Sequence, residues 1–507
     1  MTSLWLDRPH REEGTTYPAS DFGPGASYEV LVVGAGLTGL VTALLLTRAG
    51  KRVAVVDQLQ AGGLTTGKST AKLTLLQGAR LRELLRHTAP KNARAYVEAN
   101  REGFEWLVRY LDDHGVPYQR RDAFSYAGTP DGAALVDEEV FAGLRLGLPV
   151  EKVRDLDLPF PTFGAVRLRD QAQFDPMDVV RALAGDFRAR GGTLAEGVRV
   201  TRVRTLANGR SGPCRVVTSA GEVDADRVVL ATGMPILDRG LYFAKLVPSR
   251  SYALAFRTPP GALDPDFGMY ISVDSPTRTL RSTPGEDGEG DVLVVGGNGH
   301  VTGRHPSPAD LVADLEMWTG AYFPGAERTH AWSAQDYKSA NAIPFVGWLP
   351  RGAGKVFLAT GFGKWGMTNG VAAGVRLSAE MLGGNVPWAK VLGRRVTRPQ
   401  SMLAGAAANA SVGARIATGW ARGELTALQE PAEGQGVVGR EGGRPVAACR
   451  IGGSIERVSA VCPHLGGIVN WNDLERSWDC PLHGSRFAAD GTRLEGPATG
   501  DLARVDG

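Results

Sequence analysis

The chain has 507 residues, of which 43% are hydrophobic and 22% are charged, and its formal net charge is +3. This length exceeds what one hydrophobic core can organise and predicts two to four domains, and the composition excludes a mainly disordered protein. The small net charge, without a dense Lys/Arg block, argues against nucleic acid as the main partner. The first residues contain no apolar stretch of signal-peptide length, so residues 1–27 are expected to form a short N-terminal extension.

The first predicted element, between residues 28 and 57, is a strand, a glycine-rich turn, a helix and a second strand. Its apolar run contains three glycines and changes from strand to helix period, so a buried unit explains it better than a membrane span. Gly34, Gly36 and Gly39 form a G-x-G-x-x-G pattern that lets the backbone approach a pyrophosphate, and Asp57 can accept hydrogen bonds from ribose hydroxyls. The unit predicts dinucleotide binding; a glycine-bearing turn of another α/β protein is the alternative.

Three later segments also combine glycine with small or hydroxyl-bearing residues: GGLTTGKSTAKLTLLQG at 62–78, ADRVVLATGMP at 225–235 and GKVFLATGFGKWGMTNGVAAG at 354–374. The last resembles the closing FAD segment of the D-amino-acid-oxidase-like, or glycine/sarcosine-oxidase-like, flavoprotein superfamily. In that superfamily the glycine-rich turn and the start of the following helix lie against the flavin ring. The resemblance implies further cofactor-binding residues, namely Thr65, Thr66, Lys72, Val200, Thr232, Gly233, Gly361, Gly363, Met367 and Thr368.

FAD is expected to be non-covalent, because no cysteine lies near these segments and the loop at 62–78 has no histidine. A second complete G-x-G-x-x-G motif for NAD(P) is absent from the sequence. The nearest candidate, GGNGHVTG at 296–303, has Thr302 where the third glycine would stand. We interpret it as a turn in the substrate domain.

The resemblance implies an α/β plus all-β fold class: a Rossmann-like FAD-binding domain interleaved with an antiparallel-sheet substrate domain, and a small C-terminal β domain. The oxidoreductase body takes residues 28–387, with FAD-binding parts at about 28–78, 166–240 and 324–387. The substrate domain takes about 79–165 and 241–323, which carry no motif. An Ala-rich stretch at 388–423 is expected to be a partly helical connector, and the C-terminal domain takes 424–507.

The same superfamily moves a hydride from a C–H bond next to nitrogen, or to another donor heteroatom, onto the flavin. Lys364 and Trp365 lie in the flavin-facing turn and are the first catalytic candidates, because a cation there stabilises negative charge on the reduced flavin; a lysine that reaches solvent is the alternative. His300 is a further candidate, against the alternative of an ordinary loop histidine. Lys72 is expected to order the flavin loop rather than to act as a base.

Four cysteines are too few for a disulfide framework in a chain of this size, and a cytoplasmic protein is expected. Two of them lie in Cys462-x-His464 and Cys480-x-x-His483, separated by fifteen residues. One iron of a Rieske [2Fe–2S] cluster takes two thiolates and the other takes two imidazoles, and each of two loops supplies one ligand of each kind. A structural zinc site is the alternative, although zinc fingers pair cysteine with cysteine and histidine with histidine.

The segments CPHLGG and CPLHGSRF resemble the two cluster-binding boxes of Rieske proteins, and the resemblance extends from about residue 424 to the C-terminus. High-potential members carry a disulfide whose two positions hold Gly467 and Leu482 here, which fits a reducing compartment. The TTG-x-x-TAK pattern at 65–72 is similar to that of flavoproteins fused to a Rieske domain.

The sequence therefore predicts a two-cofactor enzyme that oxidises a small amine or amino-acid-like substrate with FAD. Electrons would then pass one at a time through the cluster to an acceptor, such as a one-electron acceptor protein. Two alternatives stay open. Electrons from a donor protein could flow in reverse from the cluster to FAD for substrate reduction or oxygen activation, or the protein could be a redox carrier or sensor. Substrate identity and oligomeric state are left open.

Overall fold

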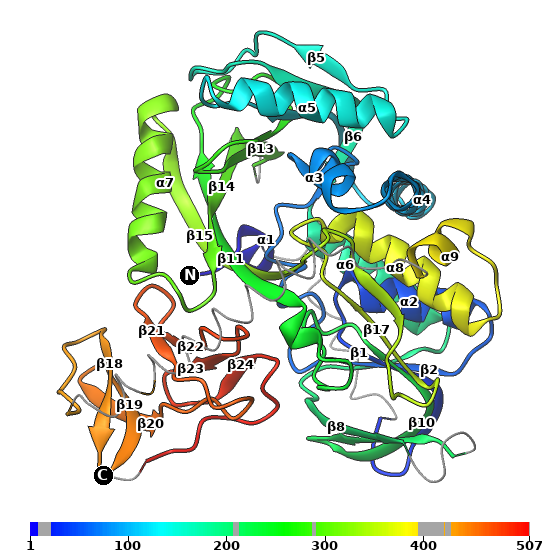
Figure 1. Cartoon of the computed structure of the whole chain (residues 1–507), viewed down its shortest axis with the longest axis vertical. Coiled ribbons are helices and arrows are strands. Elements are labelled where there is room, and N and C mark those ends of the chain that lie inside the picture. Colours follow the sequence, from blue (N-terminus) through cyan, green and yellow to red (C-terminus); the bar gives the residue numbers. More distant parts are fainter. Residues whose placement is uncertain (9–21, 206–211, 286–289, 394–419, 421–426, 506–507) are drawn as a thin grey trace.

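The computed structural model of the protein describes residues 1–8, 22–205, 212–285, 290–393, 420 and 427–505. Two large sheets, each accompanied by helices, form the body of the molecule, and a smaller all-β domain follows at the C-terminus (Figure 1). The connector expected at 388–423 lies outside the described residues except for 388–393 and Trp420; residues 388–393 belong to α9 (Pro387–Gly393).

The first sheet, called the parallel sheet below, has eight strands, and its central path runs β16-β17-β10-β1-β2-β7. Its parallel core consists of β1 (Ser27–Val33), β2 (Val53–Val56), β7 (Thr193–Ala195), β10 (Gly221–Leu230) and β17 (Val356–Thr360). Continuous apolar runs such as VLVV and VAVV suit these strands because both faces of the sheet are covered. Antiparallel strands β16 (Phe345–Trp348), β9 (Cys214–Thr218) and β8 (Val200–Thr205) extend it. Helices α2 (Leu37–Arg48), α6 (Pro176–Ala189) and α8 (Gly366–Met381) accompany it, and α2 packs on α8.

The second sheet, called the mixed sheet below, has nine strands in the order β15-β11-β14-β13-β12-β4-β6-β3, with β5 beside β6. Only β12 (Met269–Ser272) and β4 (Tyr118–Tyr126) pair in parallel. The other strands are β15 (Glu327–Ser339), β11 (Leu246–Arg257), β14 (Asp291–Val301), β13 (Arg278–Pro284), β6 (Ala165–Phe174), β3 (Lys72–Leu73) and β5 (Glu151–Val153).

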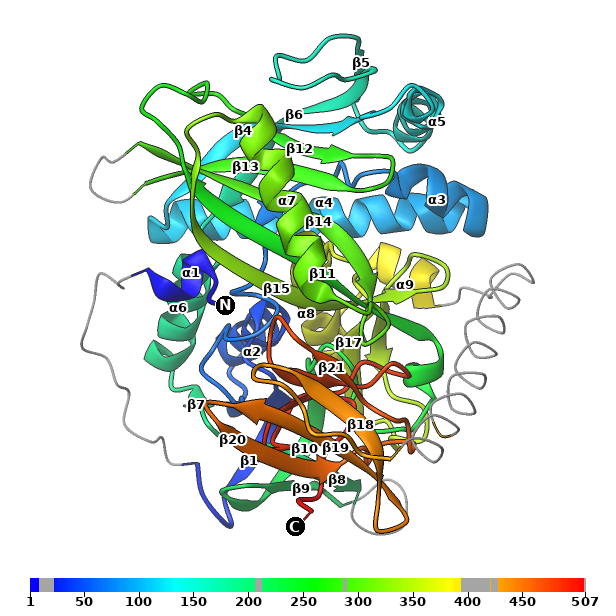
Figure 2. The same ribbon diagram turned by 90° about the vertical axis from the view of Figure 1, so that its left-hand side faces the viewer.

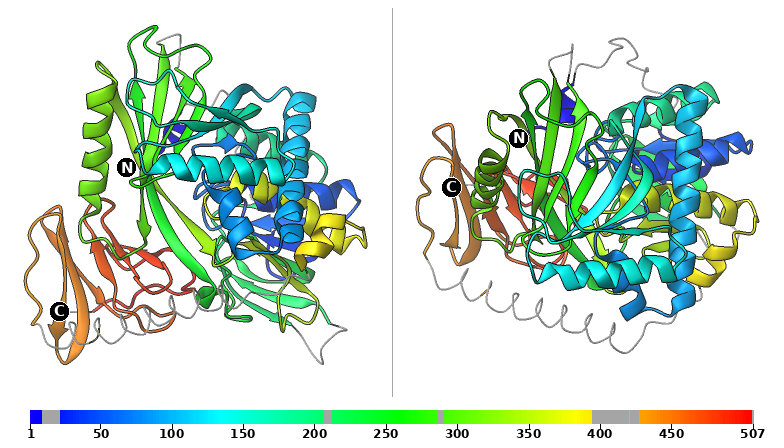
Figure 3. Two further views of the ribbon diagram at one scale, coloured as in Figure 1. Left: turned by 45° about the horizontal axis from the view of Figure 1, so that its top comes forward. Right: turned by 90° about the horizontal axis from the view of Figure 1, so that it is seen from above.

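The mixed sheet draws on more of the chain than the ranges expected for the substrate domain. Strands β6 and β15 pair into it although their residues were assigned to the parallel sheet, because β15 pairs along its length with β11. The range 79–165 also contains three helices that were not expected: α3 (Arg80–His87), α4 (Pro90–His114) and α5 (Gly132–Arg145). Residues 296–301 are the end of β14 and not the expected turn. Figure 3 shows α7 (Pro308–Tyr322) on one side of the mixed sheet and α4 and α5 on the other.

The C-terminal domain contains two small antiparallel sheets. One has β18 (Gly436–Glu441), β19 (Arg444–Ile451) and β20 (Ser454–Ser459), and the other has β21 (Asn470–Asn472), β22 (Ser477–Asp479), β23 (Arg486–Ala488) and β24 (Arg493–Glu495). Figures 1 and 2 show this orange-to-red domain against the lower end of the body. It contacts both large sheets, because Arg304 donates to the Pro481 carbonyl and Gln58 donates to the Leu494 carbonyl, each at 2.9 Å.

The first residues of the chain pack into the body. The short helix α1 (Leu4–Asp7) buries Trp5 completely, and its indole donates a hydrogen bond of 2.7 Å to the Ser69 carbonyl. The hydroxyl of Ser3 donates to the Gly67 carbonyl at the same distance. These contacts support the loop at 62–78 from outside. Among the described helices, none combines the length and apolar character that crossing a membrane requires.

Candidate functional site

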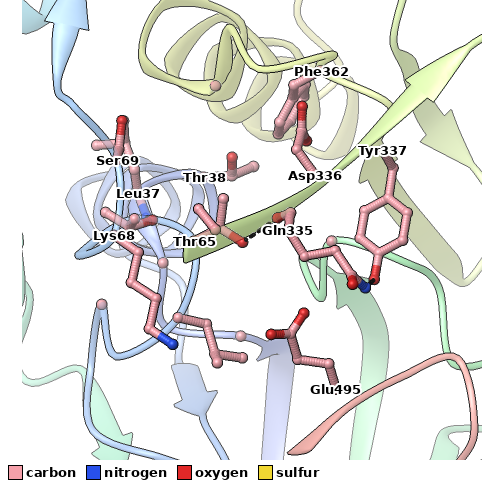
Figure 4. Close-up of a pocket in the computed structure, with 18 of the residues that line it drawn as sticks. Leu37, Thr38, Thr65, Lys68, Ser69, Gln335, Asp336, Tyr337, Phe362 and Glu495 are labelled. Carbon is pink, nitrogen blue, oxygen red and sulfur yellow. Dashed lines mark hydrogen bonds between the residues drawn. The ribbon is translucent and has the colours of Figure 1, made fainter. Parts of the chain in front are cut away.

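A cavity of about 330 Å³ lies where the two sheets and the C-terminal domain meet. Figure 4 shows side chains from three separate parts of the chain around it, among them Thr65, Gln335 and Glu495. The residues predicted from sequence that line it are Gly34, Gly36, Asp57, Thr65, Thr66, Lys72, Val200, Thr232, Gly233, Lys364, Trp365 and Met367.

The glycine-rich turn after β1 forms one end of the cavity. Gly34 has φ +108°, and a Cβ there would lie 2.5 Å from the Ala231 carbonyl oxygen. A Cβ at Gly39 would overlap the Gly34 carbonyl, so this glycine lets α2 pack close to the turn as predicted. Gly36 is the residue before α2, and Gly36, Leu37 and Thr38 at the start of this helix line the cavity. The turn therefore has the backbone and the helix terminus that a dinucleotide pyrophosphate requires.

Asp57 lies at the end of β2 and lines the same end of the cavity. Its carboxylate accepts hydrogen bonds from the amides of Ala35 at 2.7 Å and Leu59 at 2.9 Å. Burial raises the pKa of Asp57, and the two amide donors oppose that shift. The acid is thus held beside the glycine turn, where the predicted ribose contact requires it.

The loop between β2 and β3 crosses the middle of the cavity. Thr65 donates to the Gln335 carbonyl at 2.9 Å, and the Thr66 hydroxyl accepts from the Leu37 amide at 3.2 Å. The buried ammonium of Lys72 donates to the Tyr270 carbonyl at 2.7 Å and to the Thr279 hydroxyl. Burial lowers the pKa of Lys72 well below its usual range. These bonds tie the loop to the mixed sheet, as expected for a lysine that orders it.

The turn between β17 and α8 forms the opposite wall. Gly361, Gly363 and Lys364 all have positive φ, of +82°, +60° and +73°. The carbonyl of Gly363 accepts a 2.6 Å hydrogen bond from the buried guanidinium of Arg80, and a Cβ at Gly363 would collide with that guanidinium. The tight turn places Phe362, Lys364 and Trp365 in the cavity wall.

Lys364 is the only one of the three catalytic candidates that pairs with a second ionisable cavity residue. Its amide donates to the Asp336 carboxylate, and its ammonium lies beside the backbone of Gly299 in β14. The side chain of Lys364 is accessible to solvent. The protein packed around it still lowers the pKa of Lys364, and the Asp336 carboxylate opposes that shift. Burial also raises the pKa of Asp336. Lys364 and Asp336 therefore place a titratable charge in this wall of the cavity.

Five residues predicted for this site lie outside the cavity lining: Gly39, Gly361 and Gly363, and the side chains of His300 and Thr368. His300 stacks its ring on Tyr252 at a centroid distance of 5.8 Å, so it stands behind a lining residue rather than in the wall. Thr368 is buried and donates to Asn100 at 2.5 Å, which turns its side chain toward α4 instead of the cavity. The differences at His300 and Thr368 arise because side chains of successive residues leave a turn or strand in different directions.

The two Cys/His loops of the C-terminal domain bring the predicted cluster ligands together. Cys462 and Cys480 are 1% and 2% exposed, and their thiols are in hydrogen-bonding contact. The rings of His464 and His483 meet almost at right angles, edge to face, at a centroid distance of 5.1 Å. Each loop closes on itself, because the Cys462 amide donates to the Gly467 carbonyl and the Cys480 amide donates to the Ser485 carbonyl, both at 2.8 Å. A thiolate pair beside an imidazole pair is the donor set that the two irons of a Rieske cluster take.

Ser485 and Phe487 follow the second loop. The Ser485 hydroxyl is in hydrogen-bonding contact with the Cys462 thiol and accepts from the Ala498 amide at 3.0 Å. Phe487 is fully buried in the core of this domain and pairs across β22 and β23 with Trp478. The loop therefore offers the thiolates one hydroxyl donor, and an aromatic ring without a hydroxyl follows it.

The imidazole side of the loops faces the body. His464 Nε2 lies 2.9 Å from Asp238 Oδ1, and the ring of Phe243 meets His464 and His483 edge-on at 5.1 and 5.0 Å. Both body residues belong to the segment that follows β10. Earlier residues of this segment, Thr232 to Ile236, line the cavity. One short stretch of chain thus contacts both sites.

A buried ion pair holds the C-terminal domain on the mixed sheet. Arg250 in β11 has no exposed surface and binds Glu475 through two hydrogen bonds of 2.6 and 2.7 Å. Arg486 lies 3.1 Å from the same carboxylate. Burial alone would raise the pKa of Glu475, but the two guanidinium groups hold it well below its usual range. Nη1 of Arg250 makes no hydrogen bond in the described structure and lies 3.6 Å from Glu495 Oε1. Removing one partner of such a buried ion pair is strongly destabilising, because the other charge is left buried.

Sequence reasoning missed several residues that these sites use. Asp238 and Phe243 have no motif, because their contacts depend on docking of a domain more than 200 residues away. The same holds for Arg493, Glu495 and Gly496, which extend from the C-terminal domain into the cavity wall. In Figure 4 Glu495 and Lys68 point toward the same space from opposite sides.

Comparisons with known proteins agree with both sites. The family model described as FAD dependent oxidoreductase matches residues 29–380, and that of the Rieske [2Fe-2S] domain matches residues 424–506. A protein of Bacillus subtilis (strain 168) described as a Rieske 2Fe-2S iron-sulfur protein, YhfW, is 30% identical over 94% of this chain and 93% of its own length. Glycine oxidase from Geobacillus kaustophilus superposes with a TM-score of 0.59 at 18% identity, covering 71% of this chain and 96% of that one. For L-proline dehydrogenase from P. horikoshii these values are 0.57, 16%, 72% and 96%.

Proposed function

This chain belongs to the FAD dependent oxidoreductase family and carries a Rieske [2Fe–2S] domain, and from that premise we propose that it oxidises a small amine or amino-acid-like substrate and delivers the electrons through the cluster domain. When bound, FAD supplies two-electron hydride chemistry and the cluster supplies one-electron transfer. The residues of this chain then have to hold the substrate near the FAD cavity and connect that cavity to the cluster loops.

The observation that carries the proposal is the short link between the two sites. Ile236 lines the cavity and Asp238 meets the cluster ligand His464. Two residues of fully extended chain span at most about 7 Å, so the cavity wall and the cluster loop are joined over a short stretch of protein. Phe243 fills the space beside both histidines. Such proximity suits electron exchange between the two cofactors within one chain.

The proposed substrate class rests on the chemistry of the cavity wall. Tyr252, Trp332 and Trp365 give it aromatic surface, and Lys364 gives it a titratable cation. An apolar cavity with a few placed charges suits a small molecule that carries one charged end, such as an amino acid or a related amine. The names of the similar folds, glycine oxidase and L-proline dehydrogenase, refer to substrates of this class.

Anaerobic mixing of the purified protein with a panel of primary and secondary amines and amino acids tests the proposal. We expect at least one member of the panel to bleach the flavin absorbance, followed by reduction of the cluster. The absence of flavin reduction by every donor, together with flavin reduction when a reduced ferredoxin is supplied, would contradict the proposal and favour reverse flow. Cofactor reduction without any product from substrate would favour a carrier or sensor.

The relay between the sites is tested with His464→Ala, which removes one cluster ligand. At saturating FAD, substrate should still reduce the flavin at close to the parent rate, whereas electron delivery to a one-electron acceptor should stop. Iron content and the visible spectrum of each preparation report the state of the cluster. Delivery at the parent rate by a variant that lacks the cluster would rule out the relay.

A further inference from the structure

The Rieske domain forms part of the wall of the cavity that the FAD-binding residues line. Arg493, Glu495 and Gly496, from β24 and the residue after it, belong to the lining. Arg493 donates a 2.5 Å hydrogen bond to the side-chain oxygen of Gln58, and the amide nitrogen of Gln58 donates to the Leu494 carbonyl at 2.9 Å. The Rieske domain and the FAD-binding body are therefore hydrogen-bonded to each other at the edge of the cavity.

This contact lies at the end of the cavity that suits the adenosine half of a dinucleotide. Gln58 follows Asp57 directly, at the end of β2, where the family fold places the ribose. Arg199 precedes Val200, and its guanidinium donates to the Arg493 carbonyl at 3.2 Å and pairs with Asp501 at 2.9 Å. Residues on both sides of the adenosine end of the cavity thus bind the Rieske domain.

Arg493 is a buried cation whose charge is not matched by an ion pair among the described residues. It is 6% exposed, and its Nε has no hydrogen-bond partner in the described structure. Burial, together with the neighbouring Arg199, lowers the pKa of Arg493 to about 10, although Asp501, which accepts from the Arg493 backbone amide at 2.8 Å, opposes this shift. A buried charge of this kind is costly unless an opposite charge approaches it, and arginine is the residue best suited to bind phosphate oxygens.

We propose that Arg493 is an FAD ligand supplied by the Rieske domain, which closes over the adenosine half of the cofactor. The pyrophosphate of FAD brings negative charge to the cavity end where Arg493 lies, and β24 covers the entrance beside Gln58. Retention of FAD then depends on the docked Rieske domain, and bound FAD in turn stabilises the docking by the same free energy. This inference holds for either direction of electron flow and for any substrate.

Dilution of the holoprotein tests the proposal, because released FAD is more fluorescent than bound FAD and can be followed without turnover. We compare the parent with Arg493→Gln, which removes the charge, and Arg493→Lys, which keeps it. Arg504→Gln is the matched control, since Arg504 belongs to the same domain, its side chain is 72% exposed, and it lies 3.6 Å from Asp490. Iron is measured in each sample to report the integrity of the cluster.

Arg493→Gln should raise the dissociation constant of FAD roughly tenfold or more, the effect of a lost charge-assisted hydrogen bond. Arg493→Lys should recover part of the affinity, and Arg504→Gln should bind FAD like the parent. ADP, which carries adenosine and pyrophosphate without flavin, should bind the FAD-free form of Arg493→Gln more weakly than that of the parent by a similar factor. Unchanged FAD retention in Arg493→Gln would overturn the proposal.

A loss of iron together with FAD in Arg493→Gln would point to a disrupted domain, and Arg493→Lys then decides the question. If Arg493→Lys keeps its iron and binds FAD more tightly than Arg493→Gln, the cation is the ligand. If Arg493→Lys keeps its iron but loses FAD as fully as Arg493→Gln does, the charge is not what holds the cofactor and the proposal fails.

Discussion

His464 Nε2 and Asp238 Oδ1 lie 2.9 Å apart, and this contact joins a predicted ligand of the Rieske cluster to the FAD-binding body. If His464 binds iron through Nδ1, its Nε2 would donate to the Asp238 carboxylate, and this bond would fix the ring orientation. The carboxylate also places a negative charge close to the cluster. Asp238 therefore has two separable effects, one on docking and one on the electronic state of the ligand.

Asp238→Asn should raise the reduction potential of the cluster by an amount on the order of tens of millivolts, the scale of about 1 kcal/mol for a one-electron couple. The amide keeps a hydrogen-bond acceptor but removes the negative charge that disfavours the reduced, more negative cluster. A redox titration followed by the cluster spectrum measures the shift. Asp266→Asn is the matched control, because the side chain of Asp266 is 94% exposed and distant from the cluster. A potential at or below that of the parent would contradict the expected role of the charge.

Phe487→Tyr should also raise the cluster potential, because a hydroxyl directed at the cluster sulfurs stabilises the reduced state. Phe487 is fully buried, so the added hydroxyl must find a partner or it will destabilise the domain. The potential and the melting temperature should be measured on the same preparation. An unchanged potential with a lower melting temperature would show that the ring edge faces the domain core and not the sulfurs.

Lys364→Met should slow flavin reduction by substrate roughly tenfold or more. The cation in the turn between β17 and α8 would no longer stabilise the negative charge that develops on the flavin as it is reduced. Stopped-flow bleaching of the flavin at saturating substrate and saturating FAD measures the rate. Lys152→Met serves as the control, since Lys152 forms an exposed ion pair with Asp137 far from the cavity. If only the substrate concentration for half-maximal rate rises, Lys364 binds substrate without acting on the chemical step.

The raised pKa of the buried Glu139 predicts that the stability of the FAD-binding body depends on pH. Its fully buried carboxylate accepts from the amides of Leu81 at 3.0 Å and Arg82 at 2.9 Å, and burial raises its pKa to about 7. Between the unfolded pKa, about 4.5, and the folded pKa, the native chain holds a proton that the unfolded chain has lost. The free energy of unfolding contributed by Glu139 therefore falls as the pH rises through this window.

Glu139→Gln stays neutral, so the melting temperature of the parent should fall more steeply than that of the variant between pH 5 and pH 7.5. Thermal melts of both proteins at matched ionic strength give the difference at each pH. Parallel curves across the window would show that Glu139 is ionised in the native state at the lower pH already, because the two amide donors outweigh burial.

The parts of each site that the sequence predicted are those set by local spacing. The contacts of Gly34 and Gly39 follow from backbone geometry within a few residues, and the same is true of Cys462 and His464 on one tight loop. The FAD and Rieske assignments depend on such local features, and the family comparisons confirm both. The catalytic role of Lys364 stays a prediction, whereas His300 lies behind Tyr252 and outside the cavity wall.

Features that depend on contacts between distant parts of the chain could not be predicted from local spacing. Strand β15, with the sequence ERTHAWSAQDYKS, is mostly polar and has no apolar pattern that assigns it to a sheet, so only its pairing with β11 decides its place. Helices α3 and α4 were missed although each has an apolar face: α3 buries Leu81 and Leu84, and α4 buries Phe104, Leu107 and Leu111 at helical spacing. Arg493 has no local signature at all, because its surroundings come from a different domain.

The buried contact between Arg250 and Glu475 matters to anyone who would build new electron-transfer enzymes by joining domains. A grafted Rieske domain without a carboxylate at the position of Glu475 would leave Arg250 buried without its partner, and breaking such a pair costs roughly 3–5 kcal/mol. The same mismatch would arise if this Rieske domain were moved to an oxidoreductase body without an arginine at the position of Arg250. A functional chimaera would have to exchange Arg250 and Glu475 together. Its design would therefore have to carry over the residues on both sides of the domain interface and not the Rieske domain alone.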